Sequence, residues 1–204
     1  MIFESRCAGC DRPGATICTT CRFALVGARV APTADGVISA VPFAGRARDV
    51  LLGLKYRNRR AVGGHLAGLV VNRLVESGVA GDVDVVTWAP TSAKRRRERG
   101  YDQAELIARV VGRQLGVPVK RLLDRRDDVR QTGRSRHERL DGPAFAARPG
   151  VDGLRVVVID DVVTTGATLR RAAAALRQRR ADVVCAAVAA TPVPAVAAPI
   201  VAAA

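Results

Sequence analysis

The segment from Val156 to Leu169, VVVIDDVVTTGATL, constrains the fold of this chain more than any other segment. It opens with four β-branched apolar residues, Val156 to Ile159, which is typical of a strand buried on both faces of a parallel sheet. Two adjacent carboxylates and a Thr/Gly-rich turn follow, and apolar residues then return at helical spacing. A strand, an acidic pair, a small-residue loop and a helix in this order indicate a ligand site at the carboxyl end of a parallel strand.

The residue types in this segment suit a sugar phosphate. Backbone N–H groups at a helix start attract an anion, and a loop with Gly and short side chains lets the anion approach closely. The Thr hydroxyls add donors for phosphate, whereas the two carboxylates can accept hydrogen bonds from the 2- and 3-hydroxyls of a ribose. Neither a P-loop Gly-Lys-Ser/Thr nor a GxGxxG fingerprint is present. We therefore predict that ribose 5-phosphate is bound by Asp160, Asp161, Val163, Thr164, Thr165, Gly166, Ala167 and Thr168.

Four cysteines near the start of the chain have the spacing CxxC-x7-CxxC, at Cys7, Cys10, Cys18 and Cys21. Two CxxC turns supply four thiolates that can converge tetrahedrally, and such a closed set favours a structural zinc knuckle. A disulfide pair and a redox CxxC are the alternatives. Because the spacing is tighter than in common zinc ribbons, a distorted or vacant site also stays open.

The chain is strongly basic, with a formal net charge of +14. Such a charge ordinarily indicates a polyanionic partner such as nucleic acid. However, 30 of the 33 basic residues are arginine, beside abundant Ala, Val and Gly. The same bias arises when a GC-rich genome fills solvated faces with arginine, so the global charge leaves both interpretations open.

The two ends of the chain bear on its location. Met1 to Cys7 has no basic start followed by an apolar run, so we expect no signal peptide and a reducing, cytoplasmic location. The last 22 residues, from Val183, carry no charge. Pro192, Pro194 and Pro199 argue against a membrane span there. We expect a last strand at Val183–Ala190 followed by a loose tail.

The pattern between these ends predicts an α/β fold with a mostly parallel sheet and helices on both faces. We expect three regions: a cysteine-rich segment with its linker (1–36), the main domain (37–190) and a tail (191–204). The expected elements, in order, are a linker at Phe23–Gly36, a strand at Val37–Phe43, a helical region at Val50–Asn72, a strand at Val83–Thr87, a helix capped by Asp102 and ended by Gly116, and a strand at Val119–Leu123.

Two further segments carry candidate ligand contacts. Ala89–Ser92 forms a turn after a predicted strand, and five cations follow within six residues, at Lys94, Arg95, Arg96, Arg97 and Arg99. The cations can form a solvated patch, a nucleic-acid stripe or a set of phosphate ligands. Asp124–Pro143 is a long charged connection, which is typical of a functional lid, although a disordered basic loop is the alternative.

Asp160–Thr168 resembles the phosphoribosyl-pyrophosphate motif of type I phosphoribosyltransferases, and the chain as a whole resembles the ComF family. Arg97-Glu98-Arg99-Gly100-Tyr101-Asp102-Gln103-Ala104, Leu54-Lys55-Tyr56 and the four cysteines carry the second resemblance. The resemblance implies a type I phosphoribosyltransferase fold that binds phosphoribosyl pyrophosphate with Mg²⁺, and a structural Zn²⁺. It implies these roles: catalysis by Asp160 and Asp161; pyrophosphate binding by Ala89, Pro90, Thr91, Ser92, Arg97 and Arg99; and flexible-loop contacts by Gln131 and Arg139.

The activity implied is transfer of a phosphoribosyl group to a nitrogenous acceptor. Where the family has Pro-Val-Pro-Leu and Phe-Asn, this chain has Trp88-Ala89-Pro90-Thr91 and Tyr101-Asp102, so the acceptor stays open. ComF relatives are associated with natural transformation, so the alternative is a competence-type protein that binds single-stranded DNA and keeps the sugar site for binding or sensing. Phe, Tyr and Trp total only seven and are scattered, which argues against a dedicated stacking platform. A dimer is plausible.

Overall fold

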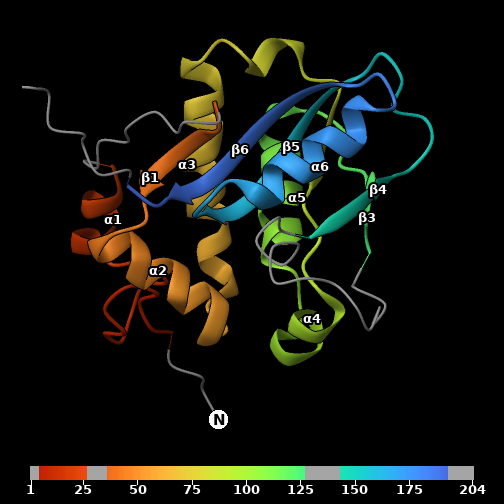
Figure 1. Ribbon diagram of the computed structural model, residues 1–204. Helices are drawn as coiled ribbons and strands as arrows, with labels where there is room; N and C mark the ends of the chain where they lie inside the picture. Colours follow the sequence, from red (N-terminus) through yellow and green to blue (C-terminus); the bar gives the residue numbers. More distant parts are fainter. Residues whose placement is uncertain (1–4, 27–35, 127–142, 193–204) are drawn as a thin grey trace, which may run out of the picture.

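The computed structural model describes residues 5–26, 36–126 and 143–192 (Figure 1). The strands are β1 (Ile38–Pro42), β2 (Val85–Trp88), β3 (Leu123–Arg126), β4 (Ala144–Ala147), β5 (Arg155–Val163) and β6 (Asp182–Ala190). The helices are α1 (Thr19–Val26), α2 (Gly45–Tyr56), α3 (Gly63–Glu76), α4 (Ala93–Arg99), α5 (Gln103–Leu115) and α6 (Ala167–Arg177). Two 3-10 turns, Arg60–Val62 and Ala80–Asp82, precede α3 and β2 respectively.

Four strands form a parallel sheet in the order β1-β6-β5-β2. β5 lies inside the sheet, with Val156 paired to Val183 of β6 and to Val85 of β2. The four apolar residues that open β5 are fully buried, as a strand covered on both faces requires. The α/β class with a parallel sheet, predicted from the sequence, is confirmed.

Helices cover both faces of this sheet (Figure 1). Side chains alternate along a strand, so Val157 and Ile159 of β5 join one buried cluster with residues of α2, α3 and α5. Val156 and Val158 join a second cluster with residues of α6 and Leu123 of β3. The loops that carry the candidate ligand residues follow the carboxyl ends of strands β2 and β5.

β3 and β4 form a separate antiparallel pair. A strand was predicted at Val119–Leu123, but only Val119 pairs with the parallel sheet, through one bridge to Val86. The chain then leaves the ladder, because the backbone N–H of Leu122 donates to the Thr87 hydroxyl (3.2 Å) instead of to a strand carbonyl. β3 therefore begins only at Leu123, where it pairs antiparallel with β4, and the predicted strand is wrong in its bounds.

The predicted linker at Phe23–Gly36 is also wrong in its first part. Phe23 to Val26 belong to α1, because Cys21 and Leu25 on that helix are buried in the same cluster as α2. Residues 27–35 of the linker, and the tail from 193, lie outside the described residues. Among the described residues, no helix combines the length and the apolar character that crossing a membrane requires.

Candidate functional site

A cavity of about 360 Å³ opens at the carboxyl ends of β2 and β5. Because parallel strands end at the same edge of the sheet, the loops after β2 and β5 meet here with the end of α2 and the start of α5. The lining residues are Phe43, Lys55, Tyr56, Ala89, Pro90, Thr91, Arg95, Arg99, Asp102, Gln103, Ala104, Arg125, Asp160, Asp161, Val162, Thr164 and Thr168.

Asp160 and Asp161 both line the cavity from the last part of β5, which continues to Val163. The Nζ atom of Lys55 lies 3.0 Å from Oδ2 of Asp161, and both side chains are largely buried (16% and 13% exposed). The backbone N–H of Asp161 donates to Oδ1 of Asp160 (2.8 Å). Burial, followed by the neighbouring charge of Asp161, raises the pKa of Asp160 to about 8. The site therefore holds two carboxylates in unlike environments.

The Thr/Gly loop forms a small cradle of about 30 Å³ between the end of β5 and the start of α6. Gly166 precedes the helix with φ +75°, a left-handed conformation that L side chains rarely adopt. The cradle faces the N-terminal turn of α6, where backbone N–H groups have no partner within the helix. Seven of the eight residues predicted to bind ribose 5-phosphate line this cradle: Asp160, Val163, Thr164, Thr165, Gly166, Ala167 and Thr168. The eighth, Asp161, lines the larger cavity.

The turn after β2 lines the opposite wall of the cavity through Ala89, Pro90 and Thr91. Ser92 instead caps α4, because its hydroxyl accepts from the backbone N–H of Arg95 (3.3 Å). Asp102 fixes the turn, since its Oδ2 accepts from the backbone N–H of Thr91 (2.8 Å). Burial raises the pKa of Asp102, although three backbone N–H groups oppose the shift. The sequence indicated only the capping role of Asp102.

Cationic side chains from α4 and β3 reach the same cavity. Arg95 and Arg99 line it, whereas Arg97, which was predicted to bind pyrophosphate, is not among the lining residues. Arg99 donates to Oε1 of Gln103 (3.1 Å) and to the hydroxyl of Tyr56 (3.2 Å). Arg125 donates to the carbonyl oxygen of Pro90 (3.4 Å).

The lining residues that sequence reasoning did not assign individually to a ligand include Arg95, Gln103 and Arg125. Gln103 lies in the segment Arg97–Ala104, and the family resemblance of that segment was the signal that could have marked Gln103 as a site residue. Its side chain is 2% exposed, and its Nε2 has no hydrogen-bond partner among the described residues. Gln131 and Arg139, the predicted flexible-loop contacts, lie outside the described residues.

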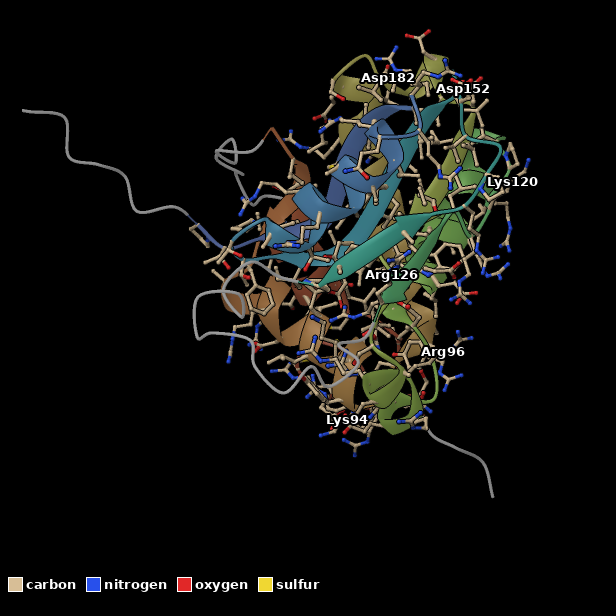
Figure 2. The ribbon with its side chains drawn as sticks, turned by 45° about the vertical axis from the view of Figure 1, so that its right-hand side comes forward. Lys94, Arg96, Lys120, Arg126, Asp152 and Asp182 are labelled. Carbon is tan, nitrogen blue, oxygen red and sulfur yellow. The ribbon has the colours of Figure 1, made fainter. Side chains whose placement is uncertain are left out.

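Charge is distributed unevenly over the molecule (Figure 2). Lys94 and Arg96 project from α4 at the end of the molecule that carries the cavity, whereas Asp152 and Asp182 lie at the other end of the sheet. The acids there are paired, Asp152 with Arg180 and Asp182 with Arg155 (3.4 Å). The exposed cations of α4 near the cavity therefore favour the approach of an anion.

The four N-terminal cysteines form a second site. Their Sγ atoms all lie within 4.8 Å of one another, and the Cys10 and Cys18 sulfurs are 3.7 Å apart. Tetrahedral zinc with Zn–S bonds of about 2.3 Å requires sulfurs about 3.8 Å apart, so the donor set fits a zinc ion. None of the five cysteines is in a disulfide in the described part of the chain. The four sulfurs are therefore free to act together as metal ligands.

The thiols of this cluster differ in their environments. Although burial opposes the shift, backbone N–H groups of Cys18, Cys10 and Gly9 lower the pKa of Cys7 to about 6. Burial raises the pKa of Cys21 to about 12. The N–H of Cys18 donates to the Cys7 sulfur over 3.3 Å, a contact that stabilises a thiolate. Cys185 lies apart from the cluster, half-buried against the Leu169 carbonyl (Sγ to O 3.9 Å).

The cysteine cluster packs directly on α2. The carbonyl oxygen of Ala8 accepts from Arg57 (2.6 Å), and Asp11 pairs with Arg59 (2.8 Å). A Cβ atom at Gly53 would lie 2.2 Å from the same carbonyl oxygen, so only glycine fits there. The helix that holds the cluster is thus the helix that sends Lys55 to Asp161.

Comparison with known proteins gives one family match and several partial structural likenesses. A search of curated proteins found no match. The allosteric regulatory enzyme of purine biosynthesis is 26% identical, with a TM-score of 0.44 over 64% of this chain and 26% of that one. Glutamine phosphoribosylpyrophosphate amidotransferase from B. subtilis is 27% identical, with a TM-score of 0.42 over 72% of this chain and 28% of that one. The chain thus spans about a quarter of the length of these two proteins.

A purine phosphoribosyltransferase from Pyrococcus horikoshii is 17% identical, with a TM-score of 0.39 over 63% of this chain and 83% of that one. The family model described as the phosphoribosyl transferase domain matches residues 101–197. The match contains Asp102, both carboxylates of β5 and the Thr/Gly loop, but neither the four N-terminal cysteines nor Lys55. The second half of this chain is therefore similar to a phosphoribosyl transferase domain.

Proposed function

We propose that this protein binds phosphoribosyl pyrophosphate with Mg²⁺ and transfers the phosphoribosyl group to a nitrogenous acceptor. One observation carries the proposal: a carboxylate pair, a helix-start loop and a backbone turn face one cavity with arginines in its wall. The match of residues 101–197 to the phosphoribosyl transferase domain supports the same activity.

The roles follow from the chemistry of each wall. The 5-phosphate binds at the Thr164–Thr168 loop, where N–H groups and hydroxyls of the helix start donate to its oxygens. The ribose hydroxyls donate to Asp160 and Asp161. Since Lys55 already pairs with Asp161 at 3.0 Å, the ribose must share or displace that ammonium. The pyrophosphate lies along Ala89–Thr91, whose geometry Asp102 fixes through the Thr91 N–H.

In the reaction, the acceptor nitrogen forms a bond to C1 of the ribose while the C1–O bond to pyrophosphate breaks. Pyrophosphate leaves with the bonding electron pair, and the proton of the acceptor nitrogen passes to solvent. Positive charge develops on the ribose, so Asp161 beneath it stabilises the transition state, while Asp160 orients the hydroxyls. Arg99 stabilises the departing charge, and a preorganised donor of this kind is worth about 2.7–4 kcal/mol.

The cavity suits Mg²⁺ because its acidic wall and the ligand both offer oxygen donors. Mg²⁺ prefers phosphate oxygens, carboxylates and water, and it keeps several waters when bound. When present, the ion would be held on the side of Asp160 and Asp161 and would supply positive charge that stabilises the pyrophosphate leaving group. The cysteine set, which contains only sulfur donors, suits Zn²⁺ instead, and we assign it a structural role.

The carboxylate assignment is tested with the double variant Asp160→Asn and Asp161→Asn. Calorimetry should show that the variant loses measurable affinity for ribose 5-phosphate, because amides replace the hydroxyl acceptors. The matched control, Asp152→Asn with Asp182→Asn, removes the same charge at the far end of the molecule and should bind as the parent does (Figure 2). Unchanged affinity in the first variant would refute the assignment.

A second candidate function is a competence-type role in which the protein binds single-stranded DNA during DNA uptake. The exposed cations of α4 favour it, because Lys94 and Arg97 have no side-chain partner in the part of the chain that the structure describes. A DNA ligand would give a steep fall of log affinity with log salt concentration. A shallow slope, with pyrophosphate released in the presence of an acceptor base, favours transfer instead.

The ComF family, suggested by the cysteines and by Arg97–Ala104, is the more specific assignment that we propose. It carries with it the flexible-loop roles of Gln131 and Arg139 and a cytoplasmic location. The packing of the cysteine cluster on α2 supports this assignment, since it joins the cysteine segment to the helix that carries Lys55. Bound zinc and affinity for phosphoribosyl pyrophosphate in one purified chain would support it together.

A further inference from the structure

A second cavity, of about 460 Å³, adjoins the first at the ends of α2 and α4. It shares Lys55, Tyr56, Arg95 and Arg99 with the first cavity, and Asn58, Glu98 and Tyr101 complete its wall. Neither the turn at residues 89–92 nor the segment at residues 160–168 lines it. The second cavity is therefore continuous with the donor site but separate from both phosphate loops.

An aromatic side chain is presented at the border of the two cavities. Tyr56 is 68% exposed, which makes it one of the most exposed large apolar side chains of the described residues. The guanidinium of Arg99 lies 5.1 Å from its ring centre and donates to its hydroxyl (3.2 Å). Arg99 thus holds the ring in place while most of the ring stays open to a planar ligand, the arrangement that stacking requires.

The charges around this ring select the ligand further. The Arg95 guanidinium makes no hydrogen bond or ion pair within residues 5–26, 36–126 and 143–192, and Arg99 contacts only neutral side-chain groups. Three cations line the cavity against a single acid, Glu98, whose carboxylate likewise has no ion-pair partner among those residues. The wall therefore favours an anion, and guanidinium groups favour a carboxylate in particular.

We infer that this second cavity is the acceptor site, and that its ligand is a planar nitrogen compound bearing a carboxylate. The ring stacks on Tyr56, the carboxylate pairs with Arg95, and the nitrogen faces the donor cavity past Lys55. This assignment rests on the proposed phosphoribosyl transfer, in which the nitrogen displaces pyrophosphate from C1. It adds the class of acceptor and the residues that select it.

The test measures binding of matched acid and neutral probes to the full chain: anthranilate against aniline, and nicotinate against nicotinamide. Ribose 5-phosphate, pyrophosphate and Mg²⁺ are present at saturation, so that the anionic probe cannot bind in the donor cavity. We expect each acid to bind about tenfold more tightly than its neutral counterpart, the effect of one hydrogen bond to a charged group. Arg95→Ala should abolish this preference.

Two further variants separate stacking from charge. Tyr56→Ala should weaken the acid and the neutral probe alike by about tenfold, the usual cost of losing an aromatic stack. Glu98→Gln should strengthen binding of the acids alone by about two- to fivefold, as removal of one exposed charge allows. Glu76→Gln makes the same charge change at the end of α3 and should alter neither probe.

The outcomes distinguish this inference from the function on which it rests. If ribose 5-phosphate and pyrophosphate do not bind at all, the proposed function itself fails. If they bind, but acid and neutral probes bind equally or Arg95→Ala keeps the preference, only the acceptor assignment is overturned. Binding of an oligothymidine that Tyr56→Ala weakens, without binding of anthranilate, would assign the cavity to nucleic acid and overturn it as well.

Discussion

The cysteine cluster and the carboxylate pair each bring ionisable groups of one kind together, but the first is a closed set of donors and the second opens into a cavity. The four sulfurs lie within 4.8 Å of one another and point at one another. Asp160 and Asp161 on β5 line a cavity of about 360 Å³, and Lys55 of α2 pairs with Asp161. A closed donor set suits an ion that stays, whereas an open one suits a ligand that is exchanged.

The difference also explains how each region is stabilised. The segment at residues 5–26 contributes few large apolar side chains to the core, so a metal ion would supply much of its stability. The carboxylate pair instead destabilises the fold, because burying like charges costs folding free energy until a ligand or a cation compensates that cost. The three predictions that follow test this contrast, beginning with the largest effect.

Removal of two zinc ligands should have the largest effect. In Cys10→Ser with Cys18→Ser, we expect loss of bound zinc and of a metal-binding free energy on the order of 10 kcal/mol. Metal content by mass spectrometry and hydrogen exchange of residues 5–26 would show both losses. Cys185→Ser, outside the cluster, is the control and should keep one zinc per chain. Zinc retained by the double variant would show that the closed set is not a metal site.

The carboxylate pair should make stability fall as pH rises. Asp160 has a pKa of about 8 in the folded chain against 3.8 for an ordinary aspartate, so the unfolded chain releases this proton first. Between about pH 4 and pH 8, the free energy of unfolding should therefore fall by up to about 1.4 kcal/mol per pH unit. Asp160→Asn should remove this part of the slope.

Denaturant titrations at several pH values would measure the slope. Burial also raises the pKa of Asp102, which therefore adds a slope of the same sign in the parent and in Asp160→Asn. The difference between the two slopes isolates the contribution of Asp160. Asp152→Asn, an exposed substitution at the far end of the molecule, should leave the slope unchanged. Identical slopes in the parent and in Asp160→Asn would contradict the raised pKa of Asp160.

The smallest expected effect concerns Gly53, where the two regions share α2. A Cβ there would lie 2.2 Å from the Ala8 carbonyl oxygen, so Gly53→Ala should force the cysteine segment away and cost roughly 1–3 kcal/mol. Gly64→Ala, in α3 with open space around it, should instead stabilise by about 0.5–1 kcal/mol. Thermal unfolding of the two variants compares them directly. Equal shifts of the melting temperature in the same direction would contradict the close packing of the cysteine segment against Gly53.

Local patterns predicted the parts of the fold that depend on neighbours in sequence. The helix that begins after Asp102 and ends at Gly116 was expected from its cap and its glycine, and the structure confirms both ends. The buried strand at Val156–Ile159 was expected from its β-branched run and is confirmed. Each of these features depends only on residues within one helix or strand, so it can be predicted from the sequence alone.

The remainder depends on how distant elements dock. α4 has no apolar periodicity, and its helix is fixed by the Ser92 cap and by Gly100 with φ +75°. The pairing of Lys55 with Asp161 joins residues on α2 and β5, whose docking no local pattern reveals. The Thr87 hydroxyl ends the strand predicted at Val119–Leu123 by accepting from the backbone N–H of Leu122, which periodicity cannot indicate. The candidate site was thus predicted as motifs, and Arg99 of its cationic wall was predicted with them. Arg125 was not, and the predicted Arg97 does not line the cavity.

The last turns of α2 impose a constraint on spacing. Gly53 and Arg57 face the cysteine segment, while Lys55 and Tyr56, between them in sequence, face the cavities. One inserted residue would rotate everything beyond it by about 100° around the helix axis. The interval from Gly53 to Tyr56 therefore cannot change in length without misaligning either the metal-binding segment or the lysine. Length variation in relatives of this chain should fall before Gly45 or after Arg59, and not between these residues.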